Sequence, residues 1–342
     1  MGVVDADSAH MHPALRLVAD RQFGVFTARD AVAAGYAPDE VQGAVARRRW
    51  MRVRRGVYAA REVVEAVADD AVASHRLACA AVLVRLGGRP AVSHASAARL
   101  QGMVVPATWD GRIRLTDEAQ WRRGRGYAVA AASLPPSHVV PLGAFRATAP
   151  ARTLVDCARE WTLEDAVVAM DAALNAELLT PAALQAAVLD QTHWMGIGDG
   201  ARAAGLADGR AESPLETLGR LRIIGSGLPV PELQVEIHDA RGFVARVDAW
   251  YEEAAVAVEF DGQVKYTDPR DGRSPALVHW DEKRREDRVR DLDVRVVRVA
   301  RADLGPGWRR VEERLRALLT TPLTGPRRFT AVRLGASLSR PA

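Results

Sequence analysis

Residues 247–266 read VDAWYEEAAVAVEFDGQVKY and place three acidic side chains, Asp248, Glu259 and Asp261, in or beside two apolar runs. Short runs rich in valine and aromatic residues are typical of β-strands. Strand interiors rarely hold carboxylates, because a buried charge costs free energy unless it is paired. The stretch therefore predicts two adjacent strands and a site at which the carboxylates gain a partner.

The carboxylates can meet if the two strands pair as a hairpin. Asp248 and Glu259 would then lie near each other at one end of a sheet, and Asp261 would share the face of Glu259 because it is two positions further on. Like charges this close repel, and a divalent cation removes that cost. Mg²⁺ or Mn²⁺, held by Asp248, Glu259 and the carbonyl of Phe260, would activate water for attack on a phosphate.

Each acidic residue also has an ordinary structural interpretation. Glu216 fits a capping box that begins three residues before it, so it would close a helix start, and this role can coexist with a catalytic one. Asp261 is followed by glycine and fits a turn. Asp248 could pair with Arg246 or Arg241 on the surface.

The stretch sits inside an ordered series of elements. The sequence predicts a helix, three strands, a helix, a strand and a helix at 213–227, 232–239, 243–251, 255–262, 277–291, 294–300 and 307–319. This order is typical of an α/β unit, predicted at residues 206–320. Residues 321–342 are predicted to form a disordered basic tail.

An acid on one strand and an acid-x-acid pattern on the next, flanked by helices, resembles the PD-(D/E)xK nuclease superfamily. The similarity extends over residues 210–305 and is greatest to the very-short-patch-repair-like endonucleases. The resemblance implies a restriction-endonuclease-like fold, Asp248 and Glu259 as metal ligands, and Glu216 as the acid of the first helix.

The sequence departs from that pattern in two places. Asp261 replaces the final lysine of the motif, and Val247 replaces the proline before the first acid. Lys265 or Lys283, the chain's two lysines, would then stand in for the missing one, although Lys283 also fits a solvated helix face. If neither reaches the metal, the domain would bind DNA without cutting it.

Composition excludes several other classes of protein. The chain has 342 residues, with 48% hydrophobic and 26% charged, as in soluble globular proteins. No apolar run approaches the ~20 residues of a membrane span, and two cysteines cannot form a disulfide framework, so a cytoplasmic location is expected. Ser93 and His94 are adjacent, so we expect their side chains to diverge and His94 to be structural.

The first sixty residues predict a winged helix-turn-helix. Helices are expected at 12–22, 26–35 and 37–50, followed by a basic hairpin at 50–60. Residues 61–205 mix helical and strand patterns and predict an α/β middle domain. A glycine-rich linker is expected at 195–212.

Basic charge is concentrated at the N-terminal end of the chain. Residues 1–150 carry 20 arginines against 13 acidic residues, and six of these arginines lie between Arg47 and Arg55. In a winged helix the recognition helix enters the major groove and the hairpin touches phosphates. The sequence therefore predicts DNA contacts by Gln42, Arg47, Arg48, Arg49, Arg52, Arg54 and Arg55. The alternative is a protein-interaction winged helix with a solvated basic face.

A second resemblance covers residues 10–180. VFTARDAVAAGYAPDEVQGAVARRRWMRVRRGVYA at 25–59, AVSHASAARLQGM at 91–103 and PARTLVDCARE at 150–160 are similar to AbiEi-type antitoxins. The resemblance implies a DNA-binding repressor of a type IV toxin–antitoxin or phage-defence locus, with a cognate toxin or a second copy of the chain as partner.

Three functions follow from these patterns, of which the third is a repair or mobile-element accessory factor. The first is Mg²⁺-dependent cleavage of DNA directed by the winged helix, with catalytic residues Glu216, Asp248, Glu259, Asp261, Lys265 and Lys283. The alternative is a transcriptional repressor or antitoxin whose nuclease-like domain is inactive. The predicted fold is a multidomain α/β protein with an N-terminal winged helix, an α/β middle region and a C-terminal restriction-endonuclease-like domain.

Overall fold

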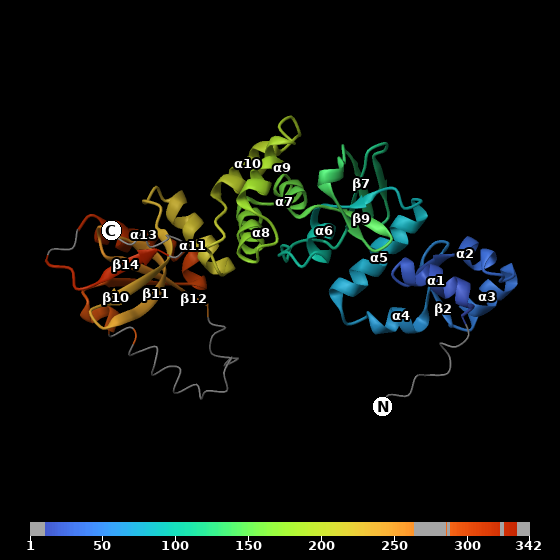
Figure 1. Ribbon diagram of the computed structural model, residues 1–342, viewed down its shortest axis with the longest axis horizontal. Helices are drawn as coiled ribbons and strands as arrows, with labels where there is room; N and C mark the ends of the chain where they lie inside the picture. The colour runs from blue at the N-terminus through green and yellow to red at the C-terminus, as the bar shows by residue number, and fades with distance from the viewer. Residues whose placement is uncertain (1–10, 263–284, 286–287, 322–324, 334–342) are drawn as a thin grey trace, which may run out of the picture. The chain divides into compact units, whose positions relative to one another are not determined.

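The computed structural model describes residues 11–262, 285, 288–321 and 325–333. The chain forms two compact units (Figure 1), of which the first comprises residues 1–169 and 178–206 and the second 170–177 and 207–342. The finer division predicted at residues 60, 205 and 320 stays a prediction. Among the helices in the described ranges, none is both long and apolar enough to cross a bilayer.

The first unit begins with three helices and a small antiparallel sheet. Its elements are α1 (Pro13–Arg21), β1 (Val25–Thr27), α2 (Ala28–Ala33), α3 (Pro38–Ala46), β2 (Trp50–Arg54) and β3 (Val57–Ala60). The strands lie in the order β1-β3-β2. The predicted helices and hairpin are confirmed, although α3 ends at Ala46 and leaves the next three arginines outside the helix.

Local chemistry fixes these elements. Thr27 and Asp30 form a capping box at the start of α2, in which Asp30 N donates to Thr27 Oγ1 at 3.0 Å and Thr27 N donates to Asp30 Oδ2 at 2.7 Å. Gly35, just after α2, has a φ of +102°, which glycine adopts without steric cost. The rings of Phe26 and Trp50 pack edge to face with their centroids 4.9 Å apart. Both residues belong to the hydrophobic core that the three helices cover.

The rest of the first unit is built around a six-stranded mixed sheet of order β6-β7-β5-β4-β9-β8. Its elements are α4 (Arg61–Ala66), α5 (Ala71–Arg85), β4 (Ala91–Val92), α6 (His94–Leu100), β5 (Ile113–Asp117), β6 (Arg122–Gly124), β7 (Tyr127–Ala131), the 3₁₀ helix η2 (Pro136–His138), β8 (Val139–Leu142), β9 (Phe145–Thr148), α7 (Pro150–Ala158), α8 (Leu163–Asn175), α9 (Pro181–Leu189) and α10 (Ile197–Leu206). Helix α8 continues into the second unit.

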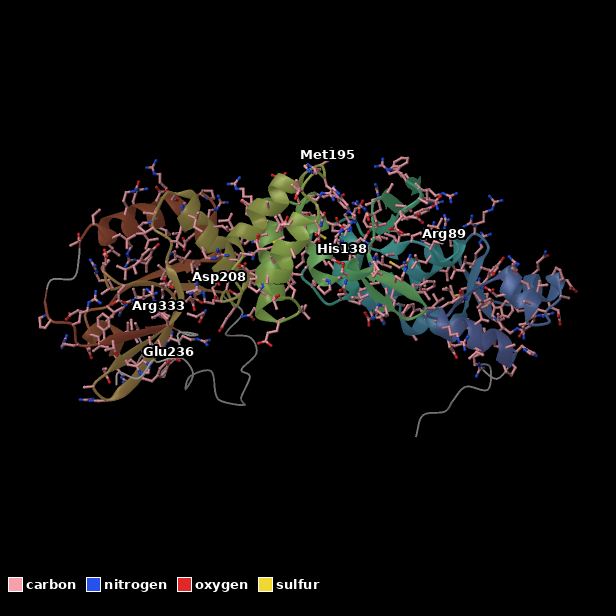
Figure 2. The ribbon with its side chains drawn as sticks, turned by 45° about the horizontal axis from the view of Figure 1, so that its top comes forward. Arg89, His138, Met195, Asp208, Glu236 and Arg333 are labelled. Atoms are coloured by element: carbon pink, nitrogen blue, oxygen red, sulfur yellow. The ribbon has the colours of Figure 1, made fainter. Side chains whose placement is uncertain are left out.

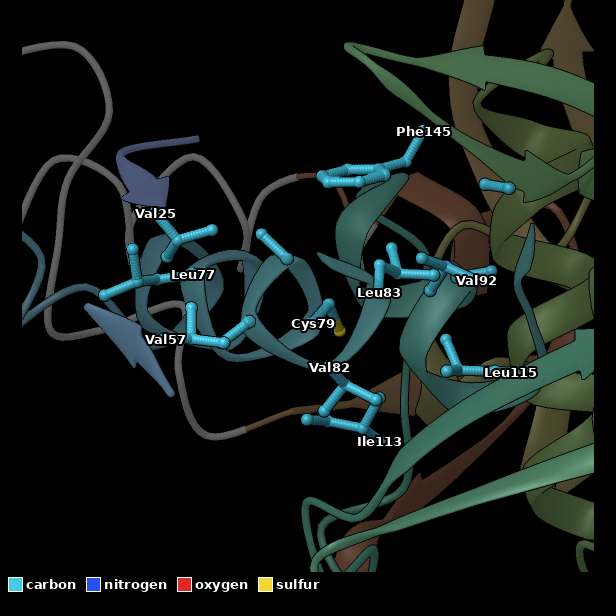
Figure 3. Packing of buried hydrophobic residues seen from close by; sticks show 14 of the residues in the cluster. Val25, Val57, Leu77, Cys79, Val82, Leu83, Val92, Ile113, Leu115 and Phe145 are labelled. Carbon is cyan, nitrogen blue, oxygen red and sulfur yellow. The ribbon is translucent and has the colours of Figure 1, made fainter. Parts of the chain in front are cut away.

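One hydrophobic core joins the two sheets of the first unit. Val25 and Val57 of the small sheet, Leu83 of α5 and Leu115 of the large sheet belong to the same buried cluster (Figure 3). Helix α5 contributes residues to this cluster along most of its length. The small sheet is therefore held against α5 by packing, and not only by the chain connection.

Helix α10 corrects the prediction of a linker at 195–212. Three of its small residues, Gly200, Ala203 and Ala204, are buried. These residues pack on α7, where a methyl group on Gly200 would still lie at an ordinary contact distance of 3.5 Å from Val155. Part of the glycine-rich segment that suggested a linker therefore forms a packed helix.

The second unit is a five-stranded sheet with helices. Its elements are α11 (Pro214–Gly225), β10 (Glu232–Asp239), β11 (Gly242–Tyr251), β12 (Val256–Asp261), β13 (Arg295–Ala300), the 3₁₀ helix η4 (Arg301–Leu304), α13 (Trp308–Leu319) and β14 (Thr330–Arg333). The strand order is β13-β12-β11-β10-β14, and only the β12–β13 pair is parallel among these strands. The predicted β11–β12 hairpin is confirmed, whereas most of the helix predicted at 277–291 lies outside the described residues.

Helices α11 and α13 pack on one face of this sheet (Figure 1). Phe260 of β12 lies on that face with Val258 and contacts α11. Because neighbouring side chains of a strand point to opposite faces, Glu259 lies on the other face. The sheet thereby separates its acidic residues from its helical core.

Strand β14 differs from the disordered tail predicted from residue 321. It pairs with β10, and the preceding Phe329 is 7% exposed and packs edge to face on Trp250 at 5.7 Å. Arg327 and Arg328 pair with Glu252 and Asp293. One buried aromatic residue and two ion pairs therefore fix this part of a basic segment to the sheet.

Gly219 of α11 is where the helix approaches β12 most closely. A methyl group there would lie 1.9 Å from Phe260 Cε1, so we expect Gly219→Ala to lower the free energy of unfolding by about 1–3 kcal/mol, measured by chemical denaturation. At Gly225, at the end of the same helix, an added methyl group would have no atom within 4 Å. Gly225→Ala should therefore leave the free energy of unfolding unchanged or raise it by up to ~1 kcal/mol. Equal effects of the two substitutions would contradict this account of the helix–sheet contact.

Candidate nucleic-acid interface and carboxylate pocket

The six arginines that follow α3 form what we call the arginine run: Arg47, Arg48, Arg49, Arg52, Arg54 and Arg55. The first three occupy the connection between α3 and β2, and within it Arg48 has a φ of +57°. Arg47, Arg48, Arg52 and Arg55 are exposed, whereas Arg49 and Arg54 are half-buried. Gln42 is exposed on α3, so the predicted base-contacting residue and the run belong to successive elements.

The arginine run carries uncompensated charge. Within the described part of the chain, none of its six side chains forms an ion pair with a carboxylate, whereas most ion pairs of this protein involve arginine. Unpaired guanidinium groups at a surface attract polyanions, because the phosphates of a nucleic acid can replace the absent carboxylates.

Arg54 has a role that the sequence did not indicate. Its Nη2 donates to the carbonyl of Arg125 at 3.0 Å, and its guanidinium lies 5.1 Å from the centre of the Tyr127 ring. Burial lowers the pKa of Arg54, and the neighbouring Arg85 lowers it further. This side chain therefore attaches β2 to the six-stranded sheet of the first unit.

The acidic residues of the opening stretch line one small pocket in the second unit. Its lining consists of Arg246, Asp248, Glu259, Phe260, Asp261, Arg285 and Arg298. The three acids therefore line the same pocket, whereas their catalytic and metal-binding roles stay predictions. Three arginines share the pocket with them, and Arg285 and Arg298 were not predicted there because they are distant in sequence.

Both oxygens of Glu259 face guanidinium groups. Oε1 lies 3.2 Å from Arg285 Nη2 and Oε2 lies 3.6 Å from Arg298 Nε. Arg298 is opposite Glu259 in the parallel β12–β13 ladder, so strand pairing itself sets this contact. Asp248 Oδ2 accepts a hydrogen bond from Phe260 N at 2.8 Å. The partners that the carboxylates require are thus largely supplied by the protein.

The described residues fit a divalent cation poorly. Arginine has no lone pair to offer a metal, and its charge opposes a cation beside the Glu259 carboxylate. Within the described ranges, no group of three or more His, Cys, Asp or Glu side chains is arranged to hold a metal ion. Lys265 and Lys283 lie outside those ranges, so their predicted role stays a prediction.

Glu216 acts at the start of α11. Its Oε1 accepts from Ser213 Oγ at 2.8 Å, and its Oε2 accepts from Glu212 N and from Gln234 Nε2, both at 2.9 Å. Ser213 Oγ in turn accepts from Glu216 N at 3.2 Å. Glu216 is not among the residues that line the carboxylate pocket. The structural interpretation of Glu216 accounts for these contacts, and its catalytic role stays a prediction.

A buried network in the first unit was missed from the sequence. Arg152 is 2% exposed, and its Nε donates to Asp156 Oδ2 at 2.8 Å. Its Nη1 lies 3.1 Å from both the Ser133 carbonyl and Nδ1 of His138, which Figure 2 labels. The guanidinium also lies 4.4 Å from the centre of the Trp194 ring. The spacing of Arg152 and Asp156, four positions apart in a predicted helix, was the available signal.

Ser93 and His94 correct a second prediction. Their side chains do not diverge, because His94 has a φ of +50° and its Nδ1 lies 2.8 Å from Ser93 Oγ. Thr116 Oγ1 donates to the same serine oxygen at 2.8 Å. Burial lowers the pKa of His94 well below its usual value, and Arg114 lowers it further. Ser93 is fully buried, so the pair is a structural contact without access for a substrate, and His94 is structural as expected.

A comparison with known protein families finds a match to the N-terminal module. Residues 13–61 match the family described as "Transcriptional regulator, AbiEi antitoxin". This range contains every element from α1 to β3 and the whole arginine run. The beginning of the chain is therefore similar to transcriptional regulators of the AbiEi antitoxin type.

Two curated proteins of Mycobacterium tuberculosis are similar to part of the chain. They are the uncharacterized proteins MT2308 of strain CDC 1551 and Rv2248 of strain H37Rv, each 39% identical over 115 residues. The match covers 34% of this chain and 42% of each relative, so the chain spans less than half the length of these proteins. The crystal structure of the RV2827C protein from the same species matches with a TM-score of 0.38 and 17% identity, over 60% of this chain and 78% of that chain.

Arg152 offers a test of the buried network. Arg152→Ala would remove the nearer of the two arginines that pair with the fully buried Asp156 and leave Arg159 at 3.2 Å, so we expect a loss of about 1–3 kcal/mol in the free energy of unfolding of the first unit. Denaturant titration monitored by circular dichroism measures this loss. Arg202→Ala, which removes an exposed arginine of α10, is the matched control and should change stability by less than about 0.5 kcal/mol. Similar losses in both variants would contradict the network.

Proposed function

We propose that this chain is a DNA-binding transcriptional regulator whose N-terminal module acts as a winged helix. Helix α3 is the recognition helix, and the β2–β3 hairpin is the wing. The observation that carries the proposal is the arginine run, six guanidinium groups that have no carboxylate partner among the described residues. The match of residues 13–61 to the AbiEi-type regulators supports it.

The position of the run suits phosphate binding. Recognition helices lie in the major groove, and the residues that flank them meet the sugar–phosphate backbone on either side. Arg47 and Arg48 follow the last residue of α3, and Arg52 is exposed on the wing. Exposed Gln42 projects from α3, where an amide side chain can pair with the edge of adenine. Arginines then provide affinity, and Gln42 contributes sequence discrimination.

Neutralisation of a toxin is a separate activity that we propose only as an extension of regulation. It follows from the antitoxin description of the matching family. A cognate toxin or a second copy of the chain would be the partner. Co-expression with the product of the adjacent gene distinguishes regulation alone from regulation combined with toxin neutralisation.

Replacing Arg47 and Arg52 with alanine tests the regulator proposal. Both side chains are exposed, so the double variant should fold normally and bind duplex DNA at least about tenfold more weakly, with a salt-dependence slope smaller by about 1–2. Fluorescence anisotropy with labelled duplexes over a range of salt concentrations measures both quantities. Arg202→Ala is the control for loss of one positive charge elsewhere in the first unit. Unchanged affinity and slope in the double variant would refute the proposal.

Metal-dependent DNA cleavage is the second candidate, because Asp248, Glu259 and Asp261 line one pocket. The guanidinium groups beside Glu259 weigh against it. We therefore expect the native chain to leave supercoiled, linear and mismatched DNA intact in Mg²⁺ or Mn²⁺, as judged by gel electrophoresis. Cleavage that disappears in both Asp248→Ala and Glu259→Ala would instead establish the nuclease.

A further inference from the structure

The hairpin formed by β6 and β7, residues 121–127, carries a second concentration of arginine in the first unit. We call it the arginine hairpin. Its sequence is WRRGRGY, and Trp121, Arg122, Arg123 and Arg125 are all exposed. Trp121 is 68% exposed, which is unusual for the largest apolar side chain. The hairpin therefore presents an aromatic ring and three cations to solvent.

The arginine hairpin has a defined shape. Gly124 pairs with Tyr127 across the turn, and Gly126 has a φ of +74°. A methyl group on Gly124 would lie 2.1 Å from the Tyr127 ring, so only glycine allows the ring to cover the turn. Strand β6 is the edge of the six-stranded sheet, so one side of the hairpin has no neighbouring strand in it. The cations are thus displayed on a constrained edge.

The arginine hairpin lies against the proposed wing. Arg54 of β2 donates to the carbonyl of Arg125 and packs over the Tyr127 ring. A methyl group added at Gly126 would lie 3.8 Å from Arg54 Nη2. Arg85 of α5 donates to the carbonyl of Arg55, which follows β2. These contacts bring arginines of the wing, α5 and the hairpin together, and we refer to them as one basic surface.

No carboxylate neutralises this surface within the described part of the chain. Arg85, Arg122, Arg123 and Arg125 form no ion pair there, as is also true of the arginine run. The two acidic residues just before the hairpin are engaged by backbone groups: Asp117 accepts from Ala119 N at 2.8 Å, and Glu118 accepts from Leu134 N at 3.0 Å. The charge remains available for an external anion.

We propose that the arginine hairpin is a second DNA-binding element, which contacts the phosphate backbone of the duplex that flanks the segment held by α3 and the wing. The inference rests on the proposed function and extends its footprint. Charged residues on an edge strand also prevent strands from pairing between molecules, but that role does not require an exposed tryptophan beside them. An exposed ring next to arginines is suited to sugars and bases. Trp121 supplies this contact without charge.

The test uses the full chain and two lengths of duplex that share the site bound by the N-terminal module. A duplex of about 10 base pairs, about one helical turn, has room for the recognition helix and the wing, and one of about 25 base pairs adds flanking backbone for the hairpin. On the longer duplex, the Arg122→Ala/Arg123→Ala double variant should bind about tenfold more weakly, with a salt slope smaller by about 1–2. On the shorter duplex it should bind as the native chain does.

Trp121→Ala separates the aromatic contact from the charge. It should weaken binding to the longer duplex severalfold without changing the salt slope, because an uncharged ring displaces no counterions. Arg202→Ala is the control for a lost surface charge, and melting temperatures verify that all variants fold. Native-like binding by the double variant on both duplexes overturns the inference while leaving the regulator proposal intact. Absence of DNA binding by the native chain overturns the regulator proposal itself.

Discussion

The hydrophobic core around α5 is the constraint on which the proposed DNA-binding surface depends. Val25 and Val57 of the small sheet and Leu115 of the large sheet share that core, so the two sheets cannot move independently without exposing it. The polar link between the two sheets is the hydrogen bond from Arg54 to the Arg125 carbonyl. A surface hydrogen bond of this kind contributes about 1 kcal/mol to the free energy of unfolding. Such a bond cannot position two sheets alone. Apolar packing therefore sets the spacing of the basic segments, and the hydrogen bond adjusts its final geometry.

The two candidate sites use arginine in opposite ways. In the carboxylate pocket, Glu259 receives Arg285 and Arg298, so the protein satisfies its own charges. Along the arginine run and the arginine hairpin, the described residues provide no carboxylates, and charge is left for a ligand. Charges that are already paired within the protein gain little from binding another ion. Arginines without carboxylate partners, by contrast, are stabilised when they bind phosphates. This contrast favours regulation over cleavage.

Sequence predicted those features that depend on local chemistry. The three N-terminal helices, the order of the described elements from α11 to α13 and the shared pocket of Asp248 and Glu259 follow from periodicity, capping and strand pairing. Features set by distant partners were missed. Arg298 reaches Glu259 only through a parallel ladder, and Phe329 anchors β14 only because its ring packs against the buried Trp250 of β11. The glycine-rich segment of α10 suggested a linker because its packing on α7 depends on a helix that is distant in sequence.

Burial also separates the sites by their response to salt. Exposed charges are screened over about 8 Å at physiological ionic strength, whereas partly buried pairs are screened much less. The Glu259 side chain is 16% exposed, so its ion pairs should persist at salt concentrations that weaken phosphate contacts by exposed Arg47 or Arg122. The proposed DNA contacts of the first unit should therefore weaken with rising salt before the Glu259 ion pairs of the second unit do.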